Sequence, residues 1–338
     1  MDATDAAAPR LSVLVPAYNA AAHIEACLRS VLRQLGDGDR GFEVLVLDDA
    51  STDDTRERVA TVASSHPGQV RLIPQTTNAG ISAARNRLLA EARGHYLWFL
   101  DADDLVLPGA VADLCQLLER DAPDLVLCDF RYLRGERMSR PRCTCHAPAD
   151  VVSHDRARLV AATLAAGELH VWSKIAKREL WQQVVFPVGR HFEDIAGTCQ
   201  LLLRTRQWVH AHRPWVAYRQ HPGSIMATLT HARLDEWMSA LEGMQPLLDD
   251  PGVGAAPAAL RAIADFRLRN LASALRRAGR LVEAERAPAR DTLAGARGRL
   301  FPQGTRTVLR GWARRGWWLR ALRTARALRA IDEPGGAR

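Results

Sequence analysis

Two patterns of hydrophobic and polar residues alternate over about the first 130 positions of the chain. One is a short apolar run typical of a buried strand, which occurs as LSVLVP, FEVLVLDD, VRLIPQ, HYLWFLD and DLVLCDF. The other has an apolar residue at every third or fourth position and predicts a helix, as at Ile24, Leu28, Val31, Leu32 and Leu35. Further helices are expected at residues 53–65, 82–92 and 108–120. This succession predicts an α/β fold, a mostly parallel sheet with helices on both faces.

Polar residues follow each of the first four apolar runs. PAYN comes after the first run, Asp48 and Asp49 end the second, NAG follows the third, and DADD follows the fourth. Ligands of parallel α/β sheets bind beyond the carboxyl ends of the strands. These four strand ends therefore predict one shared binding crevice. Ser51 or Thr52 is expected to cap the helix that follows Asp49.

The pattern changes after about residue 130. Residues 131–153 are polar and rich in Arg, Cys and Pro, which predicts a loop or linker. Shorter elements follow to about residue 226, and helical periodicity dominates beyond it, as in residues 260–285.

Composition adds an expected compartment and an uneven charge. No apolar run approaches the roughly 20 residues needed to cross a bilayer, and the N-terminus lacks the features of a signal peptide, so a cytoplasmic location is expected. The six cysteines are then expected to be reduced. The group Cys143, Cys145 and His146 lacks a second ligand pair at zinc-finger spacing, which favours loop thiols over a zinc site. Of the net charge of +8, most lies in residues 301–338, which hold nine arginines and two acidic residues.

The DADD segment concentrates negative charge at the end of a hydrophobic strand. Asp101, Asp103 and Asp104 would repel one another and lose hydration there, which makes a purely structural role costly. Mg²⁺ or Mn²⁺ prefers carboxylate oxygens and completes its coordination with phosphate oxygens, so the segment predicts a metal–diphosphate site. In the alternative interpretation, Asp101 caps a turn while Asp103 and Asp104 face water.

Five segments, in order, resemble the bacterial family-2 glycosyltransferases: VLVPAYNAAAHIEACLRSVLRQ, FEVLVLDDASTDDT, NAGISAARNRLLAEARGHYLWFLDADD, HFEDI and YRQHPGSIM. The resemblance is close over about residues 10–110 and continues in order to about residue 226. It implies a GT-A fold, Rossmann-like, with a nucleotide-sugar-binding half at 9–115 and an acceptor half at 116–226. Residues 227–338 are then a mainly helical C-terminal extension with a basic tail.

The resemblance also implies roles for residues at the donor site. Asp49 matches the carboxylate that accepts a hydrogen bond from the base, usually uracil, while Asp48 supports the turn. Arg85 resembles a residue that reaches the nucleotide, although a solvated helix face is the simpler interpretation. The residues that match the lining of the nucleobase pocket are Pro16, Ala17, Tyr18 and Asn19. Gly80 matches the start of a helix that faces phosphate or ribose, and Asp101 resembles the first carboxylate of the DADD motif.

Metal, base and acceptor residues follow from the same resemblance. Asp103 matches the metal-ligating aspartate, and His221 matches a late metal or diphosphate contact, although a lone histidine is often structural. Asp194 matches the general base of inverting transfer, with Glu193 beside it in support; a helix cap is the alternative for this pair. On the acceptor side the resemblance points to Trp172 and Lys174. Trp172 either stacks on a sugar ring or packs in the core.

The expected activity is therefore metal-assisted, inverting transfer of a sugar from a nucleotide-diphosphate donor, a UDP- or dTDP-sugar, to an acceptor hydroxyl. A sugar nucleotidyltransferase would need a glycine-rich loop after the first strand, and VPAYNAAAH has no glycine. A non-enzymatic alternative is an inactive transferase fold that binds membrane or nucleic acid through its basic tail. Trp312, Trp317 and Trp318 among the tail arginines are typical of helices at anionic membrane surfaces, although a solvated or packed helix is also consistent. No nucleic-acid partner is expected for the active enzyme.

Overall fold

The computed structural model describes residues 8–35, 41–220, 230–329 and 331. They form a nine-stranded sheet in the order β3-β2-β1-β4-β8-β6-β9-β5, with β7 paired to β6. The strands are β1 (Leu11–Ala17), β2 (Phe42–Asp48), β3 (Val70–Pro74), β4 (Tyr96–Phe99), β5 (Leu105–Val106), β6 (Leu125–Arg134), β7 (Arg137–Met138), β8 (Lys174–Lys177) and β9 (Trp208–Arg219).

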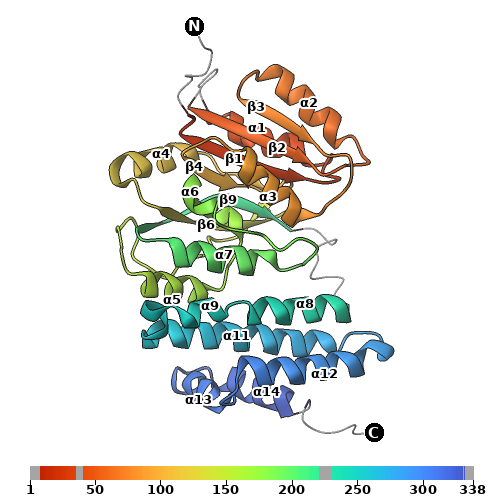
Figure 1. Ribbon diagram of the computed structural model, residues 1–338, viewed down its shortest axis with the longest axis vertical. Helices are drawn as coiled ribbons and strands as arrows, with labels where there is room; N and C mark the ends of the chain where they lie inside the picture. Colours follow the sequence, from red (N-terminus) through yellow and green to blue (C-terminus); the bar gives the residue numbers. More distant parts are fainter. Residues whose placement is uncertain (1–7, 36–40, 221–229, 330, 332–338) are drawn as a thin grey trace.

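Helices cover the sheet and then continue as a separate layer (Figure 1). Those associated with the sheet are α1 (Ile24–Leu32), α2 (Thr55–Ser65), α3 (Ile81–Glu91), α4 (Ala110–Asp121), α5 (Arg156–Ala166), the 3-10 helix η1 (Val171–Ser173), α6 (Arg178–Trp181) and α7 (Glu193–Arg204). Those of the C-terminal region are α8 (His231–Glu242), α9 (Gln245–Asp249), α10 (Pro251–Gly254), α11 (Pro257–Ala278), α12 (Glu283–Leu300), α13 (Arg306–Arg314) and α14 (Trp318–Arg329).

The sheet is mostly parallel, as the alternating pattern predicts. β1 runs parallel to β2 and β4, β2 to β3, and β6 to β9, whereas β8 lies antiparallel between β4 and β6. Successive residues of a strand face opposite sides. Leu14 and Phe99 therefore belong to the core under α3 and α7, while Val13 and Trp98 belong to the core under α1 and α4. The five predicted strands and the α/β class are confirmed.

Two local predictions are wrong. The helix after Asp49 begins at Thr55, so Asp54 occupies the cap position, without a side-chain capping hydrogen bond, and neither Ser51 nor Thr52 is the cap. The Ser51 hydroxyl instead accepts a hydrogen bond from the Asn19 backbone. Residues 131–153 do not begin as a loop, since β6 continues to Arg134 and turns back into β7. Only the part after Met138 lacks extended regular structure.

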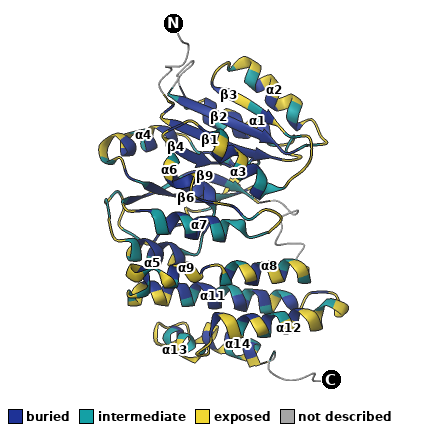
Figure 2. Ribbon diagram, in the orientation of Figure 1, coloured by how far each residue is buried: buried dark blue, intermediate teal, exposed yellow. Residues whose placement is uncertain are grey.

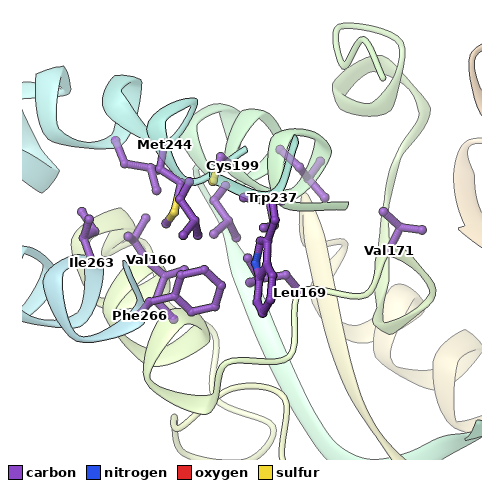
Figure 3. Close-up of a cluster of buried hydrophobic side chains, with 14 of the residues drawn as sticks. Val160, Leu169, Val171, Cys199, Trp237, Met244, Ile263 and Phe266 are labelled. Atoms are coloured by element: carbon purple, nitrogen blue, oxygen red, sulfur yellow. The ribbon is translucent and has the colours of Figure 1, made fainter. Parts of the chain in front are cut away.

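The C-terminal helices pack on the sheet domain through a continuous hydrophobic core. α11 lies along α5, α8 contacts α7, and the outer helices α12, α13 and α14 cover α11 and α8 (Figure 1). Figure 3 shows Val160 of α5 and Cys199 of α7 facing Trp237 of α8 and Phe266 of α11, all of them buried. Truncating an aromatic residue in such a core costs about 3–5 kcal/mol. The helical region is therefore an integral layer of the protein.

The basic tail belongs largely to this layer. Trp312 is fully buried, and its indole nitrogen donates a hydrogen bond to Asp265 Oδ1 at 2.7 Å. The expectation that three tail tryptophans face a membrane is therefore wrong for Trp312. Trp318, at the start of α14, remains 60% exposed, and Trp317, in the connection between α13 and α14, remains 42% exposed; Figure 2 colours this part of the outer layer largely as exposed. Within the described residues, no helix combines the length and apolar character that a membrane span requires.

Candidate active site

The ends of β1 and β2 are tied together by hydrogen bonds, and one of these runs from the Asp49 backbone N–H to the Ala17 carbonyl at 2.8 Å. Asn19 adopts φ +49°, a conformation that asparagine tolerates better than most residues, and its Oδ1 accepts a hydrogen bond from the Thr52 backbone N–H at 2.8 Å. Pro16 and Ala17 are buried, so they can offer a ligand only backbone groups. Tyr18 is half exposed and is the ring of this segment that a planar ligand could stack on.

Asp49 joins the ends of three elements. It is nearly buried, and its carboxylate accepts hydrogen bonds from Gln75 Nε2 at 2.6 Å, from the Ala79 backbone at 2.9 Å and from the Gly80 backbone at 2.8 Å. A carboxylate has about four acceptor positions, so Asp49 can accept one more hydrogen bond. Gly80 begins α3 at φ +83°, which explains the glycine. Asp48 is buried and supports the turn by accepting from the Ser51 backbone.

Arg85 is the centre of an ionic cluster, and the solvated-face interpretation of this residue is wrong. The side chain is 3% exposed, and Nη1 donates to Glu193 Oε1 at 2.7 Å and to Asp194 Oδ1 at 2.6 Å. Nη2 donates to Asp101 Oδ1 at 3.3 Å. The guanidinium also lies 5.5 Å from the centre of the Phe186 ring. α3, α7 and the end of β4 thus converge on one cation, and Arg85 orients Asp194, which the resemblance predicts to be the general base.

One guanidinium does not neutralise three carboxylates. Burial, followed by the nearby Asp194 carboxylate, raises the pKa of Glu193 to about 7. Burial also raises the pKa of Asp101, although Arg85 opposes this shift. Glu193 and Asp194 lie in the first turn of α7, where the helix dipole favours negative charge, but Phe192 occupies the cap position. Near neutral pH the Glu193 carboxyl is therefore divided between its protonated and ionised forms.

The DADD turn contains negative charge that nearby protein groups compensate only in part. Asp104 is fully buried, so the prediction that it faces water is wrong. Its Oδ1 accepts from the Arg219 backbone at 2.7 Å, but its Oδ2 has no hydrogen-bond partner among the residues that the structure describes. Burial and the charges of Asp101 and Asp103 raise the pKa of Asp104 well above its usual range. Asp103 is partly exposed, and its carbonyl oxygen accepts from Arg219 Nε at 2.8 Å.

These features fit a divalent cation. Hard cations bind carboxylate oxygens and offset the repulsion that otherwise raises carboxyl pKa values. The buried Oδ2 of Asp104 and the partly exposed Asp103 both belong to the turn where the resemblance predicts a metal. The other predicted metal contact, His221, lies outside the described residues.

The two predicted acceptor residues lie beneath the surface. Trp172 is 1% exposed and Lys174 is fully buried, so neither side chain lies where an acceptor could reach it directly. Lys174 Nζ donates to the His170 carbonyl at 2.8 Å and to Ser173 Oγ at 2.8 Å, and burial lowers the pKa of Lys174 to about 8. Both residues instead support the segment that leads into β8.

That segment presents His170, which sequence reasoning missed. Its ring stacks on Trp172 at 4.8 Å between centres and 7° between planes. Nδ1 lies 3.9 Å from Asp194 Oδ2, and Nε2 lies 3.5 Å from Glu168 Oε2. A signal existed in the sequence, because GELHVWSK puts a histidine and a carboxylate directly before the acceptor motif. The second oxygen of Asp194 thus faces an imidazole, while the first is held by Arg85.

Comparison with known proteins identifies the family of the chain. The glycosyl transferase family 2 model matches residues 12–191. The chain is 28% identical over 222 residues to the "Uncharacterized glycosyltransferase YibD" of Escherichia coli K12, a match that spans 64% of this chain and 63% of that protein.

Solved structures show the same fold. Residues 1–349 of TarS from S. aureus, in complex with UDP-GlcNAc, align with a TM-score of 0.69 and 18% identity over 95% of this chain and 90% of that one. The mannosyltransferase PcManGT from Pyrobaculum calidifontis, in complex with GDP-Man and Mn²⁺, aligns with a TM-score of 0.54 and 22% identity over 97% and 87% of the two chains. The expected GT-A fold is confirmed.

The family match covers more than half of the chain and includes the four strand ends, Arg85 and the segment that carries His170. Glu193 and Asp194 follow its last residue closely and are joined to it by the Arg85 cluster. The chain therefore belongs to glycosyl transferase family 2, and it is a glycosyltransferase of the bacterial type.

Proposed function

We propose that this glycosyltransferase moves a sugar from a UDP- or dTDP-sugar to an acceptor hydroxyl with inversion at the anomeric carbon. The observation that carries the proposal is the Arg85 cluster, because it joins Asp194 to Asp101 of the DADD turn through one guanidinium. A base beside the diphosphate-binding turn is the arrangement that inverting transfer needs.

In the proposed reaction Asp194 acts as the general base. The acceptor oxygen attacks the anomeric carbon, the bond from that carbon to the diphosphate oxygen breaks, and the hydroxyl proton passes to Asp194. Arg85 holds Oδ1, which leaves Oδ2, on the His170 side, to receive the proton. His170 and Glu168 would position this oxygen, and Glu193 would support the cluster without taking the proton. Trp172 and Lys174 are proposed to act through His170.

The donor base is proposed to bind between Tyr18 and Asp49. Asp49 has about one acceptor position left, which suits the single N3–H donor of uracil or thymine, whereas guanine presents two adjacent donors, N1–H and the 2-amino group, that would need two positions. The start of α3 at Gly80 offers a helix N-terminus for phosphate or ribose. The UDP-GlcNAc complex of TarS supports a uridine donor, whereas PcManGT binds GDP-Man, so the base is a point to test.

Mg²⁺ or Mn²⁺ is the proposed cofactor, with Asp103 and His221 as its proposed protein ligands and Asp101 as the first carboxylate of the DADD turn. When bound, the cation would stabilise the negative charge on the departing diphosphate. Among the described residues the buried Oδ2 of Asp104 has no hydrogen-bond partner, and the pKa of that carboxyl is raised; these features and the Mn²⁺ of the PcManGT structure support the assignment.

The proposed acceptor is a glycan, a lipid-linked sugar or a small molecule, in envelope polysaccharide, glycolipid or natural-product synthesis. An anionic membrane surface is the proposed secondary partner. Exposed Trp317 and Trp318 stand beside exposed arginines, and a groove of about 700 Å³ between α11 and α13 is lined in part by Arg310 and Arg314. Each basic residue near such a surface contributes roughly 1 kcal/mol. This surface would hold the enzyme peripherally on the inner face of a membrane.

Asp194→Asn tests the proposal. The variant keeps the size and polarity of the side chain but cannot accept the proton, so release of nucleoside diphosphate from UDP-GlcNAc, dTDP-glucose or GDP-mannose should slow by roughly 10²–10⁴-fold. Affinity for UDP, measured by calorimetry with Mn²⁺, should hardly change. Asp291→Asn, at an exposed position on α12, is the matched control. A rate near that of the wild type would refute the mechanism, and loss of UDP binding would reassign Asp194 to the donor site.

A further inference from the structure

The structure brings together a second group of metal-ligand side chains, separate from the DADD turn. Asp129, Cys143 and His210 each point one ligand atom into a common space, and these atoms all lie within 4.8 Å of one another. Asp129 and His210 are almost completely buried, and Cys143 is partly buried. We propose that this group binds a zinc-type ion, Zn²⁺ or Co²⁺, with His212 as a fourth ligand.

An irregularity in β9 builds the histidine half of this site. Residues two apart on a regular strand face the same side, roughly 6.5–7 Å apart along the strand. Here the pairing of β6 with β9 shifts register around Asp129, and His212 adopts φ +51°, an uncommon conformation for a histidine. The His210 and His212 rings consequently stack at 5.1 Å. His210 Nε2 lies 2.8 Å from Asp129 Oδ1, and His212 Nε2 lies 3.8 Å from Asp129 Oδ2.

The segment after β7 supplies the thiol. Arg142 forms an isolated bridge with Phe130, and the Thr144 backbone donates to Asp129 Oδ1 at 2.9 Å. The Thr144 hydroxyl also donates to the Cys128 carbonyl at 2.7 Å. These contacts hold the residues on either side of Cys143 against β6, so its sulfur lies close to Asp129 and His210 without needing to move far.

The donor set selects the metal class. One thiolate, imidazole nitrogens and one carboxylate are the ligands of tetrahedral Zn²⁺, whereas Mg²⁺ prefers oxygen ligands throughout. A thiol binds the ion as a thiolate, so its proton passes into solvent as the sulfur–metal bond forms. Affinity should therefore increase with pH. The sequence analysis favours loop thiols at Cys143 because it considers only Cys145 and His146, its neighbours along the chain. The other proposed ligands come from β6 and β9 and are brought to Cys143 by the fold.

Such an ion would tie the segment after β7 to β6 and β9 beside the acceptor side of the active site. Phe130, next to Asp129, packs edge-on against Trp172 at 5.0 Å. The competing explanation is a metal-free network in which the segment is held by the His210–Asp129 contact, the Thr144 hydrogen bonds and a hydrogen bond from the Cys143 thiol to the Cys145 carbonyl at 3.2 Å. The two explanations differ in the spectrum expected on adding Co²⁺, because only a metal site with a thiolate ligand gives a thiolate-to-cobalt charge-transfer band.

Titration of the full-length, EDTA-treated protein with Co²⁺ is the test. We expect one equivalent to produce tetrahedral d–d bands and a thiolate-to-cobalt charge-transfer band, which Zn²⁺ displaces and excess Mg²⁺ does not. Cys143→Ser should abolish the charge-transfer band. His146→Gln and Cys115→Ser should retain it, because neither residue belongs to the group. Asp103→Asn should also retain it, which separates this site from the proposed catalytic metal.

A second measurement does not depend on the cysteine variant's folding. Zn²⁺ should raise the melting temperature of the wild type and of His146→Gln but not of His212→Gln, an exposed position where substitution leaves the buried Asp129–His210 pair intact. Absence of the cobalt bands in the wild type, or a charge-transfer band unchanged by Cys143→Ser, would overturn the proposal in favour of the metal-free network.

Discussion

Replacement of Glu193 by Gln is expected to stabilise the folded enzyme above neutral pH. The Glu193 pKa is about 7 in the folded protein against an ordinary value of 4.5. The folded state thus holds the proton more tightly, so this contribution to stability is complete below pH 4.5 and is lost as the pH rises to about 7. At about 1.4 kcal/mol per pKa unit, the loss amounts to about 3 kcal/mol. Gln stays neutral, and its carbonyl oxygen can still accept from Arg85 Nη1.

Urea unfolding without divalent cations, at several pH values from 5 to 8.5, measures this effect. Relative to their difference below pH 4, the free energies of unfolding of wild type and Glu193→Gln should diverge by only about 1 kcal/mol at pH 5 and by about 3 kcal/mol in favour of the variant at pH 8. Glu136→Gln, at an exposed turn position, should track the wild type throughout. A difference that does not change with pH, or a variant less stable than the wild type at pH 8, would refute the charge argument.

Three other predictions follow from the donor site and the tail. Asp103→Asn should lose the Mn²⁺-dependent part of UDP affinity in calorimetry while the melting temperature is retained; equal metal dependence in the two proteins would contradict its assignment. UDP and dTDP should compete for the donor site better than GDP, and a preference for GDP would remove Asp49 from base recognition. Trp318→Ser combined with Leu322→Ser should weaken salt-sensitive co-sedimentation with anionic vesicles, since both residues are exposed on α14. Val282→Ser, exposed elsewhere, is the control; equal sedimentation of all three proteins would refute the membrane contact.

The fold class was predictable because parallel strands are buried on both faces. Runs such as LSVLVP and HYLWFLD have no polar alternation, and the structure buries every residue of β1 and β4. The antiparallel insertion of β8 was not predictable, because a four-residue strand carries little periodicity. The basic tail shows the same limit in another way, since its pattern of Arg and Trp does not reveal that Trp312 turns inward to Asp265.

The candidate site was predictable in its parts but not in its connections. Glu193 and Asp194 stand more than 100 positions from Arg85, and only the fold brings them within hydrogen-bonding distance. The sequence also says little about whether a given polar side chain is buried or exposed. Lys174 has the residue type of a substrate contact, yet its three donor positions are directed at the protein's own oxygens.

The charge balance of the site gives a physical reason to expect a cation with the donor. Five carboxyl groups gather around the two arginines Arg85 and Arg219: Asp101, Asp103, Asp104, Glu193 and Asp194. Like charges 4 Å apart near a protein surface repel by about 4 kcal/mol, and a diphosphate would add further negative charge. Without a cation, this repulsion raises the carboxyl pKa values, because protonation of a carboxylate removes its negative charge. A divalent cation removes the same repulsion without protonating the base, so raising the pH should weaken UDP binding in EDTA much more than in Mn²⁺.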